Sequence, residues 1–253
     1  MVETGLQAKP VATVSARPLK RGTRGGLPLP FQVLGVATAV ALLAAMAMAL
    51  LYAPTERVQG DVQRIFYFHV PAAWVAYLAF AVVLVGSIAY LWRRELRWDM
   101  LAQASAEIGV VFTTLALVTG SIWGRAVWGT WWTWDARLTT TLILWFIYAG
   151  YLMLRAYIPE RARAARSCAV LGIVGFIDVP IVHMSVQWWR TLHPQPVVVR
   201  AGEAPALPPT MMTTLLVALL AFTLLYALLL VLRLWAEGLR EDVAALRAAA
   251  GEV

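Results

Sequence analysis

Three histidines are the residues of this sequence best suited to metal chemistry, and each lies close to tryptophans. They are His69, His183 and His193. Neutral imidazole is a ligand for iron, copper and zinc. Twelve tryptophans accompany the histidines, and five of them fall within residues 123–134. Imidazoles beside so much flat aromatic surface indicate a metal ion held together with a flat apolar ligand.

Six apolar stretches must position these residues. They span residues 31–53, 70–92, 104–123, 138–154, 168–186 and 211–232, in a chain that is 61% hydrophobic and only 14% charged. Each stretch is about long enough for a helix of ~20 residues to cross a ~30 Å hydrocarbon core, and a helix satisfies its own backbone polar groups in lipid. The sequence therefore predicts an all-α membrane protein with six transmembrane helices.

The distribution of Lys and Arg predicts how these helices are oriented. Of the 21 such residues, 15 fall in segments on the same side as the amino terminus, and six fall on the other side. Because positive residues accumulate on the cytoplasmic side, both termini are expected in the cytoplasm. The net charge of +7 then reflects this bias, and no nucleic-acid partner is expected.

The apolar stretches and the charge distribution divide the chain into three predicted regions. Residues 1–30 are expected to form a flexible basic cytoplasmic tail. Residues 31–235 are expected to form the six-helix domain, with a tryptophan-rich outer loop at residues 124–136 between the third and fourth helices. Residues 236–253 are expected to be a cytoplasmic tail that briefly continues the sixth helix.

The predicted topology places all three histidines on the outer side. Pro71 favours the first turn of a helix, so His69 is expected at the outer cap of the second helix. His193 precedes Pro194 and is expected in a loop above the membrane, whereas His183 lies inside the fifth span. Seven of the tryptophans share that side: Trp123, Trp128, Trp131, Trp132, Trp134, Trp188 and Trp189.

Two imidazoles with few other donors indicate haem. Zinc usually takes three or four protein ligands, whereas haem supplies four nitrogens of its own and leaves two axial positions. We expect His69 and His193 to be the axial ligands. His183 is either a supporting residue or a structural histidine bonded to a neighbouring helix. The clustered tryptophans fit a platform for the ligand better than an interfacial belt, since a belt needs anchors at both faces.

Charged residues on the outer side could bind the carboxylates of such a ligand. Haem carries two carboxylates, and a guanidinium can bind a carboxylate through two hydrogen bonds. Asp135 precedes the fourth helix and is expected to cap it. Asp178 is the one acid deep in a span and is a functional candidate for that reason. The arginines available on the outer side are Arg64, Arg125, Arg137 and Arg190.

The motif WGTWWTWDARLT, residues 128–139, resembles the tryptophan-rich WWD signature of the haem-handling proteins of cytochrome c maturation. FHVPAAW before it and VPIVHMSVQWWRTLHP after it are similar to the histidine segments that flank this signature. The short chain with six spans resembles the CcmC type within that family. The resemblance covers roughly residues 59–194 and leaves residues 1–29 and 195–209 aside.

The resemblance implies transient binding of haem b through bis-histidine iron, with His69 and His193 as the two essential outer histidines. It places the platform on Trp128, Trp131, Trp132, Trp134 and Asp135. Further candidate contacts are Arg64, Arg125, Arg137, Trp188, Trp189 and His183.

Partners and location also follow from the resemblance. It implies delivery of haem to the chaperone CcmE, beside the ABC transporter subunits CcmA and CcmB and the small protein CcmD. The chain would lie in the bacterial inner membrane with its haem site on the periplasmic face. ATP hydrolysis would belong to a partner subunit, so this chain is not expected to be an enzyme.

Two other classes of function remain open on the sequence. A proton-coupled transporter could use Asp178 and His183 as an intramembrane relay. A purely structural assembly subunit could use its tryptophans only as anchors. The one-sided tryptophans weigh against the relay, and a bound chromophore would exclude the structural subunit.

Overall fold

The computed structural model describes residues 28–194 and 207–250, and this part of the chain is almost wholly helical. Six helical segments are long and apolar enough to cross a membrane: Leu29–Tyr52, Asp61–Arg93, Leu96–Trp128, Ala136–Tyr157, Arg161–Trp188 and Pro209–Ala249. The predictions of an all-helical fold and of six helices long and apolar enough to span a membrane are therefore confirmed for the described residues. Most of the predicted basic tail, residues 1–27, lies outside the described residues.

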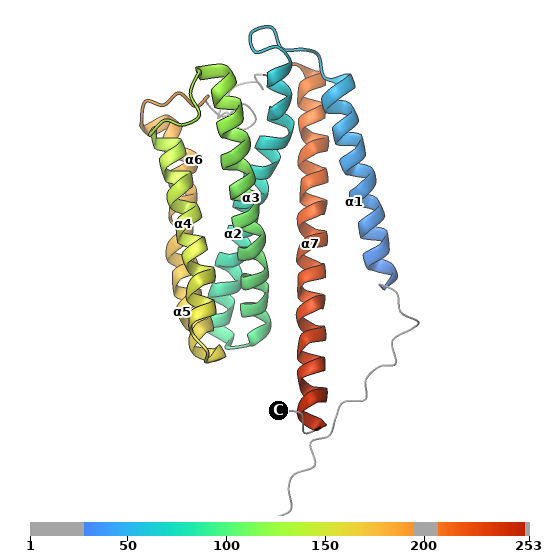
Figure 1. Ribbon diagram of the computed structural model, residues 1–253, viewed down its shortest axis with the longest axis vertical. Coiled ribbons are helices and arrows are strands. Elements are labelled where there is room, and N and C mark those ends of the chain that lie inside the picture. Colours follow the sequence, from blue (N-terminus) through green and yellow to red (C-terminus); the bar gives the residue numbers. More distant parts are fainter. Residues whose placement is uncertain (1–27, 195–206, 251–253) are drawn as a thin grey trace, which may run out of the picture.

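The six spans are built from seven α-helices and two short helical turns within the described ranges. In chain order these are α1 (Leu29–Ala47), a π-helical turn (Met48–Tyr52), a 3₁₀ helix (Asp61–Ile65), α2 (Phe66–Arg93), α3 (Leu96–Trp128), α4 (Ala136–Tyr157), α5 (Arg161–Phe176), α6 (Asp178–Trp188) and α7 (Pro209–Ala249). Figure 1 shows α1 beside α7 at one flank and α4 to α6 at the other, with α2 and α3 between them.

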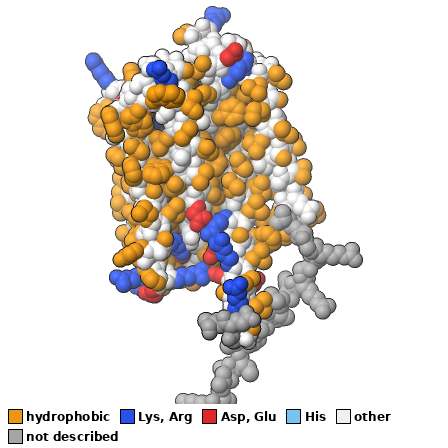
Figure 2. Space-filling model, in the orientation of Figure 1, with side chains coloured by type: hydrophobic (Ala, Val, Ile, Leu, Met, Phe, Trp, Pro, Cys, Tyr) orange, Lys and Arg blue, Asp and Glu red, His pale blue; other side chains and the backbone are white. Residues whose placement is uncertain are grey.

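The two ends of the helix bundle differ in what they carry. Residues 53–60, 129–135 and 189–194 connect or end helices at the top of Figure 1. We call this the tryptophan end, because Trp131, Trp132 and Trp134 lie there. Figure 2 shows a broad hydrophobic surface with charged side chains mostly toward its two ends. The chain is a multi-pass membrane protein.

Close packing of α2 against α3 and α5, with side chains of α4 reaching α2, forms the main core. The rings of Phe80 and Tyr148 are stacked with their centroids 3.7 Å apart. A Cβ atom on Gly109 would lie 2.5 Å from the Phe80 ring, so only glycine allows α3 to approach this closely. The Ser105 hydroxyl donates to the carbonyl of Ala79 at 2.9 Å. These contacts hold α3 rigidly against α2 below the tryptophan end.

An ion pair joins α3 and α4 near the other end. Both guanidinium NH₂ groups of Arg155 donate to the two carboxylate oxygens of Asp99, each at 2.5 Å. Asp99 is only 2% exposed, so this pair is buried. A bidentate pair compensates two buried charges and fixes the relative position of the helices that carry them.

At two prolines the helices differ from what the sequence predicted. The fifth span is broken at Ile177 into α5 and α6. Pro180 has no N–H for the carbonyl of Phe176, which accounts for the break. Pro71 lies inside α2 and not in its first turn, because α2 begins at Phe66. His69 is still within the first turn of that helix.

Two helices are longer than expected. α3 continues through Trp128, so the loop before α4 consists of residues 129–135 and is shorter than the predicted 124–136. Gly129, in the left-handed conformation with φ 76°, ends α3. α7 continues through Ala249, so most of the predicted carboxy-terminal tail is helical.

Candidate functional site

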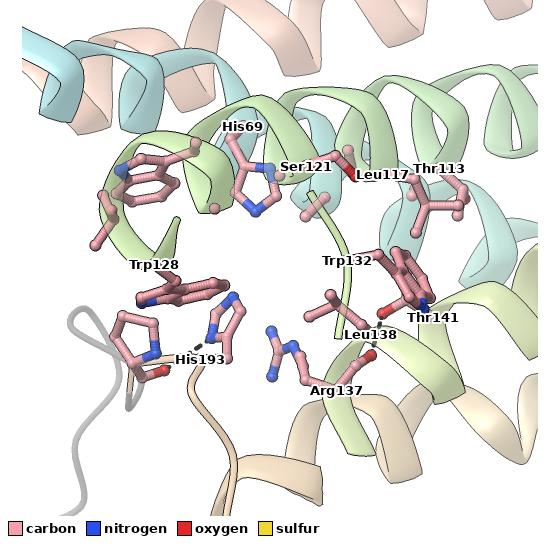
Figure 3. Close-up of a pocket in the computed structure, with 18 of the residues that line it drawn as sticks. His69, Thr113, Leu117, Ser121, Trp128, Trp132, Arg137, Leu138, Thr141 and His193 are labelled. Atoms are coloured by element: carbon pink, nitrogen blue, oxygen red, sulfur yellow. Dashed lines mark hydrogen bonds between the residues drawn. The ribbon is translucent and has the colours of Figure 1, made fainter. Parts of the chain in front are cut away.

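A cavity of about 180 Å³ lies at the tryptophan end between α2, α3 and α4, and we call it the central cavity. His69 from α2 and His193 from the segment after α6 both line it. Figure 3 shows the two imidazole rings on facing sides of this space. Most of the remaining wall is apolar or aromatic, so the cavity suits a hydrophobic ligand with a metal ion at its centre.

A hydrogen bond to Thr119 sets which nitrogen of His69 faces the cavity. Nδ1 of His69 lies 3.0 Å from Oγ1 of Thr119. That hydroxyl donates its own proton to the carbonyl of Leu115 at 2.7 Å, so it accepts a proton from Nδ1–H. The lone pair of His69 is then on Nε2, which has the form that binds a metal ion.

Two residues of α3 hold the ring of His69 in place. A Cβ atom on Gly120 would lie 3.0 Å from Cε1 of His69, so glycine makes room for the imidazole. Trp123 packs edge-on to the imidazole with ring centroids 5.8 Å apart. The indole N–H of Trp123 donates to Oε1 of Gln59 at 2.8 Å, which fixes the tryptophan in turn.

His193 has the same arrangement of its two nitrogens. Nδ1 lies 2.9 Å from the carbonyl of Pro194, which can only accept, so Nδ1 carries the proton and Nε2 carries the lone pair. Burial, followed by the positive charge of Arg137, lowers the pKa of His193 to about 4. The imidazole is therefore neutral near pH 7, as a metal ligand must be.

The tryptophans of the WWD segment divide between two hollows. Trp128 and Trp132 line the central cavity, and Trp128 packs over Gly124. Trp131 and Trp134 are 60% and 76% exposed and, together with Trp132, line a second hollow of about 590 Å³. The second hollow lies between the ends of α3 and α4, and we call it the membrane-side hollow.

Arg137 is the charged residue of the central cavity wall. It belongs to the first turn of α4, which Asp135 caps by accepting the backbone N–H of Leu138 at 2.9 Å, as the sequence predicted. One guanidinium nitrogen of Arg137 donates to the carbonyls of Val182 and His183 at 3.1 and 3.3 Å. The rest of the guanidinium can bind a carboxylate in the cavity.

Several residues singled out from the sequence do not line the central cavity. Arg64 donates to the carbonyls of Ala49 and Ala53 and so ties the π-helical turn to the 3₁₀ helix. Arg125 donates to the carbonyl of Gly129 at the end of α3. The remaining residues of this kind are exposed or partly exposed elsewhere on α6 and after it: His183, Asp178, Trp188, Trp189 and Arg190.

Sequence reasoning did not identify Thr119 or Gly120 as site residues. Gly120 and Gly124 are four residues apart and so lie on the same face of α3. That spacing of small residues in an apolar helix is a signal of close packing against the helix, here by His69 and Trp128. No comparable pattern in the sequence predicts the hydrogen bond from His69 to Thr119, because this bond depends on how α2 and α3 face each other.

Among the described residues, no third ligand of metal-binding type joins the two histidines. Within residues 28–194 and 207–250, no group of three or more His, Cys, Asp or Glu side chains could hold a metal ion. The cavity therefore offers two imidazole nitrogens to an ion that receives its other ligands from elsewhere. A macrocycle that brings four nitrogens of its own meets this requirement.

Comparison with known proteins gives one consistent result. Residues 28–249 match the family model described as CcmC, heme exporter protein C. Proteins named heme exporter protein C are similar: 45% identical over 170 residues in Bradyrhizobium diazoefficiens, 41% over 161 in Escherichia coli K12 and 38% over 207 in Haemophilus influenzae.

The extent of these matches differs between the relatives. The alignments cover 67%, 63% and 81% of this chain, in the same order. They cover 64% and 65% of the first two relatives, which is less than two thirds of their length, and 83% of the third.

Proposed function

Because this chain belongs to the heme exporter protein C (CcmC) family, we propose that it binds haem at the tryptophan end and passes it on for cytochrome c maturation. The observation that carries this proposal is the arrangement of His69 and His193. Both imidazoles line the central cavity, and each donates its Nδ1 proton to a neighbouring oxygen. Both Nε2 lone pairs are therefore available for one iron between them.

The central cavity suits the apolar body of a porphyrin better than a hydrated ion. Trp128 and Trp132 offer aromatic surface on opposite sides of the cavity in Figure 3. Stacked or edge-on aromatic contacts with a flat macrocycle contribute about 0.5–1.5 kcal/mol each beyond burial of area. None of these contacts is covalent, so the ligand can still be released.

Arg137 is the residue best placed to bind a haem propionate. It lines the cavity that holds both histidines, whereas Arg64 and Arg125 are bonded to backbone carbonyls away from it. A charge-assisted hydrogen bond contributes about 1.5–3 kcal/mol. Arg137 therefore orients the macrocycle, with its propionate edge toward the start of α4.

The exposed tryptophans suggest where haem leaves. Trp131 and Trp134 project from the loop between α3 and α4 at the tryptophan end. A chaperone that docks over this loop would lie beside the macrocycle in the central cavity. We propose that this partner is CcmE, and that replacing Trp131 and Trp132 together by alanine weakens its loading with haem.

Orientation and partners complete the proposal. The excess of Lys and Arg in the predicted inner segments supports a location of the tryptophan end on the periplasmic face of the bacterial inner membrane. The ABC subunits CcmA and CcmB, with CcmD, would work beside this chain. ATP hydrolysis in CcmA would favour release by shifting the conformation of the complex, so this chain itself binds haem and is not an enzyme.

Loss of the absorbance of bound haem tests the ligand assignment. We expect His69→Ala and His193→Ala each to remove most of the Soret band of the purified protein, whereas His183→Ala keeps it. His183 is the matched control, since it is exposed on α6 and does not line the cavity. An unchanged haem content in both His69→Ala and His193→Ala overturns the assignment.

A further inference from the structure

The central cavity adjoins the membrane-side hollow. The membrane-side hollow shares three lining residues with it, Leu117, Ser121 and Trp132. Figure 3 shows all three at the wall of the central cavity, on the side away from Trp128 and His193. The two hollows are therefore neighbours, separated by these three side chains.

The membrane-side hollow is built for contact with lipid tails. Its wall on α3 includes Val118 and Ile122, which are 51% and 47% exposed in the apolar part of a membrane span. From Leu117 to the end of α3 at Trp128 is about 16 Å at 1.5 Å per residue. The hollow thus reaches from the membrane surface to roughly the middle of a ~30 Å hydrocarbon core.

Below this hollow, α3 and α4 are in direct contact. The indole N–H of Trp145 on α4 donates to Oγ1 of Thr114 on α3 at 2.8 Å. Thr114 lies one turn from Val118, away from the tryptophan end, and Leu142 lies one turn from Trp145 toward it. The two helices are joined at one level, and the membrane-side hollow lies at the next.

Trp132 is the largest of the three side chains that line both hollows. Its indole N–H is buried but has no hydrogen-bond partner within the described ranges, and its ring packs edge-on against exposed Trp134 at 5.6 Å. Three other tryptophans are held by hydrogen bonds, Trp123 to Gln59, Trp145 to Thr114 and Trp74 to Thr223, whereas the buried indole N–H of Trp98, like that of Trp132, has no partner within the described ranges. Rotation of Trp132 breaks no such bond.

The size of the central cavity favours such a movement. Pockets for ligands of drug size usually measure roughly 300–1,000 Å³, whereas the central cavity measures about 180 Å³. The cavity is small for a macrocycle, so we expect part of its wall to move when the ligand enters. The indole of Trp132, whose N–H has no hydrogen-bond partner in the described ranges, lies in the wall toward the membrane.

We propose that the flat amphiphilic ligand of this protein enters the central cavity sideways from the adjoining lipid leaflet, between α3 and α4 and past Trp132. The ligand class is a planar apolar macrocycle with carboxylates at one edge. Such a molecule partitions into a bilayer with its carboxylates at the headgroups, and Arg137 at the start of α4 receives them at that level. This inference rests on the proposed function for the identity of the ligand.

Filling the membrane-side hollow tests this route. Ile122→Trp and Leu142→Trp each add bulk to the hollow at residues that do not line the central cavity. Val111→Trp is the matched control, because Val111 is exposed on the same face of α3 three turns further from the tryptophan end. The protein is placed in lipid nanodiscs, and haem is supplied from donor vesicles.

The rate at which the Soret band develops separates the outcomes. We expect Ile122→Trp and Leu142→Trp to slow loading at least ~10-fold with the final amplitude kept, and Val111→Trp to load at the rate of the wild type. Loading of both variants at the wild-type rate overturns the lateral route. A loss of final amplitude also overturns it, because the hollow would then be part of the resting site. Absence of a Soret band in the wild type would instead contradict the proposed function.

Discussion

Oγ1 of Thr119 lies 3.0 Å from Nδ1 of His69, and this contact determines which nitrogen of the imidazole faces the central cavity. Because the Thr119 hydroxyl donates to the Leu115 carbonyl, it can only accept from His69. The same role on the other side of the cavity belongs to the carbonyl of Pro194, which accepts from His193. Partners of this kind fix the tautomer of a metal-binding histidine and its orientation.

Thr119→Val removes the acceptor while keeping the shape of the side chain. We expect haem affinity to fall about 3- to 10-fold, since one hydrogen bond contributes about 0.5–1.5 kcal/mol. Thr119→Ser keeps the hydroxyl and should bind haem like the wild type. Nitrogen NMR of labelled histidine in the haem-free protein reports the tautomer directly, and an unchanged His69 signal in Thr119→Val would contradict this role.

Gly120 gives His69 the room it needs, so a single methyl group there should disturb the site. We expect Gly120→Ala to displace the imidazole, since the added Cβ would lie 3.0 Å from its Cε1. Haem content of the purified protein should fall several-fold or more. Gly150→Ala is the control: nothing lies within 4 Å of its Cβ position, so this helical substitution should be neutral or slightly stabilising. Equal haem contents in the two variants would show that the site tolerates a shifted His69.

Much of the fold could be predicted from the sequence, because burial in lipid imposes long apolar helices. The six spans were predicted on that basis alone, and the cap at Asp135 followed from its place before an apolar run. The helix break at Ile177 has a local signal in Pro180, but a proline does not by itself reveal whether a span bends or ends. Helix ends such as Trp128 depend on one backbone conformation, at Gly129.

The site was less predictable, because its parts come from distant segments. Histidine and tryptophan types indicated the ligand class, but they did not indicate which arginine would line the cavity. Arg64, Arg125 and Arg137 are equivalent in sequence terms, and only the packing of α4 against α2 and α3 places Arg137 in the cavity wall. Thr119 was overlooked for the same reason, since its partner lies fifty residues earlier in the chain.

The pKa of His193 predicts how haem binding depends on pH. A free imidazole titrates near pH 6.5, whereas burial and the charge of Arg137 lower the pKa of His193 to about 4. Proton and iron compete for the same Nε2, so haem affinity at His193 should be unaffected by pH down to about pH 5 and should weaken below about pH 4. Soret titrations from pH 8 to pH 4 measure this. A loss centred near pH 6.5 would mean that His193 is solvated.

The same shift affects folding stability with a definite sign. Between pH 6.5 and 4 the unfolded chain binds a proton at His193 that the folded chain does not. The free energy of unfolding should therefore fall as pH is lowered through this window, and this contribution is fully present only above about pH 6.5. His193→Gln should remove that part of the pH dependence, while a dependence that is the same in both proteins would assign it to other groups.

Arg137→Gln should weaken haem binding through the propionates. We expect a loss of about tenfold or more, because a charge-assisted bond contributes about 1.5–3 kcal/mol. Haem dimethyl ester lacks the carboxylates, so its affinity should differ little between Arg137→Gln and the wild type. Arg125→Gln is the matched control, because Arg125 lies at the same end of the bundle but outside the cavity. An equal loss for haem and its ester would mean that Arg137 acts only through its bonds to Val182 and His183.

Asp99 and Arg155 should matter for stability and not for the choice of ligand. Asp99→Ala leaves the guanidinium of Arg155 buried without its partner, and removal of one member of a buried pair costs about 3–5 kcal/mol. We expect a clearly lower thermal unfolding temperature in detergent. The double variant Asp99→Leu with Arg155→Leu should recover much of this loss, because no charge then remains buried.

The position of the Soret band separates this effect from the haem site. The ion pair joins α3 and α4 near the end of the bundle opposite to the central cavity. Any Asp99→Ala protein that remains folded should therefore bind haem with an unchanged Soret maximum. A shifted maximum would show that the pair sets the geometry of the distant site by fixing α3 against α4.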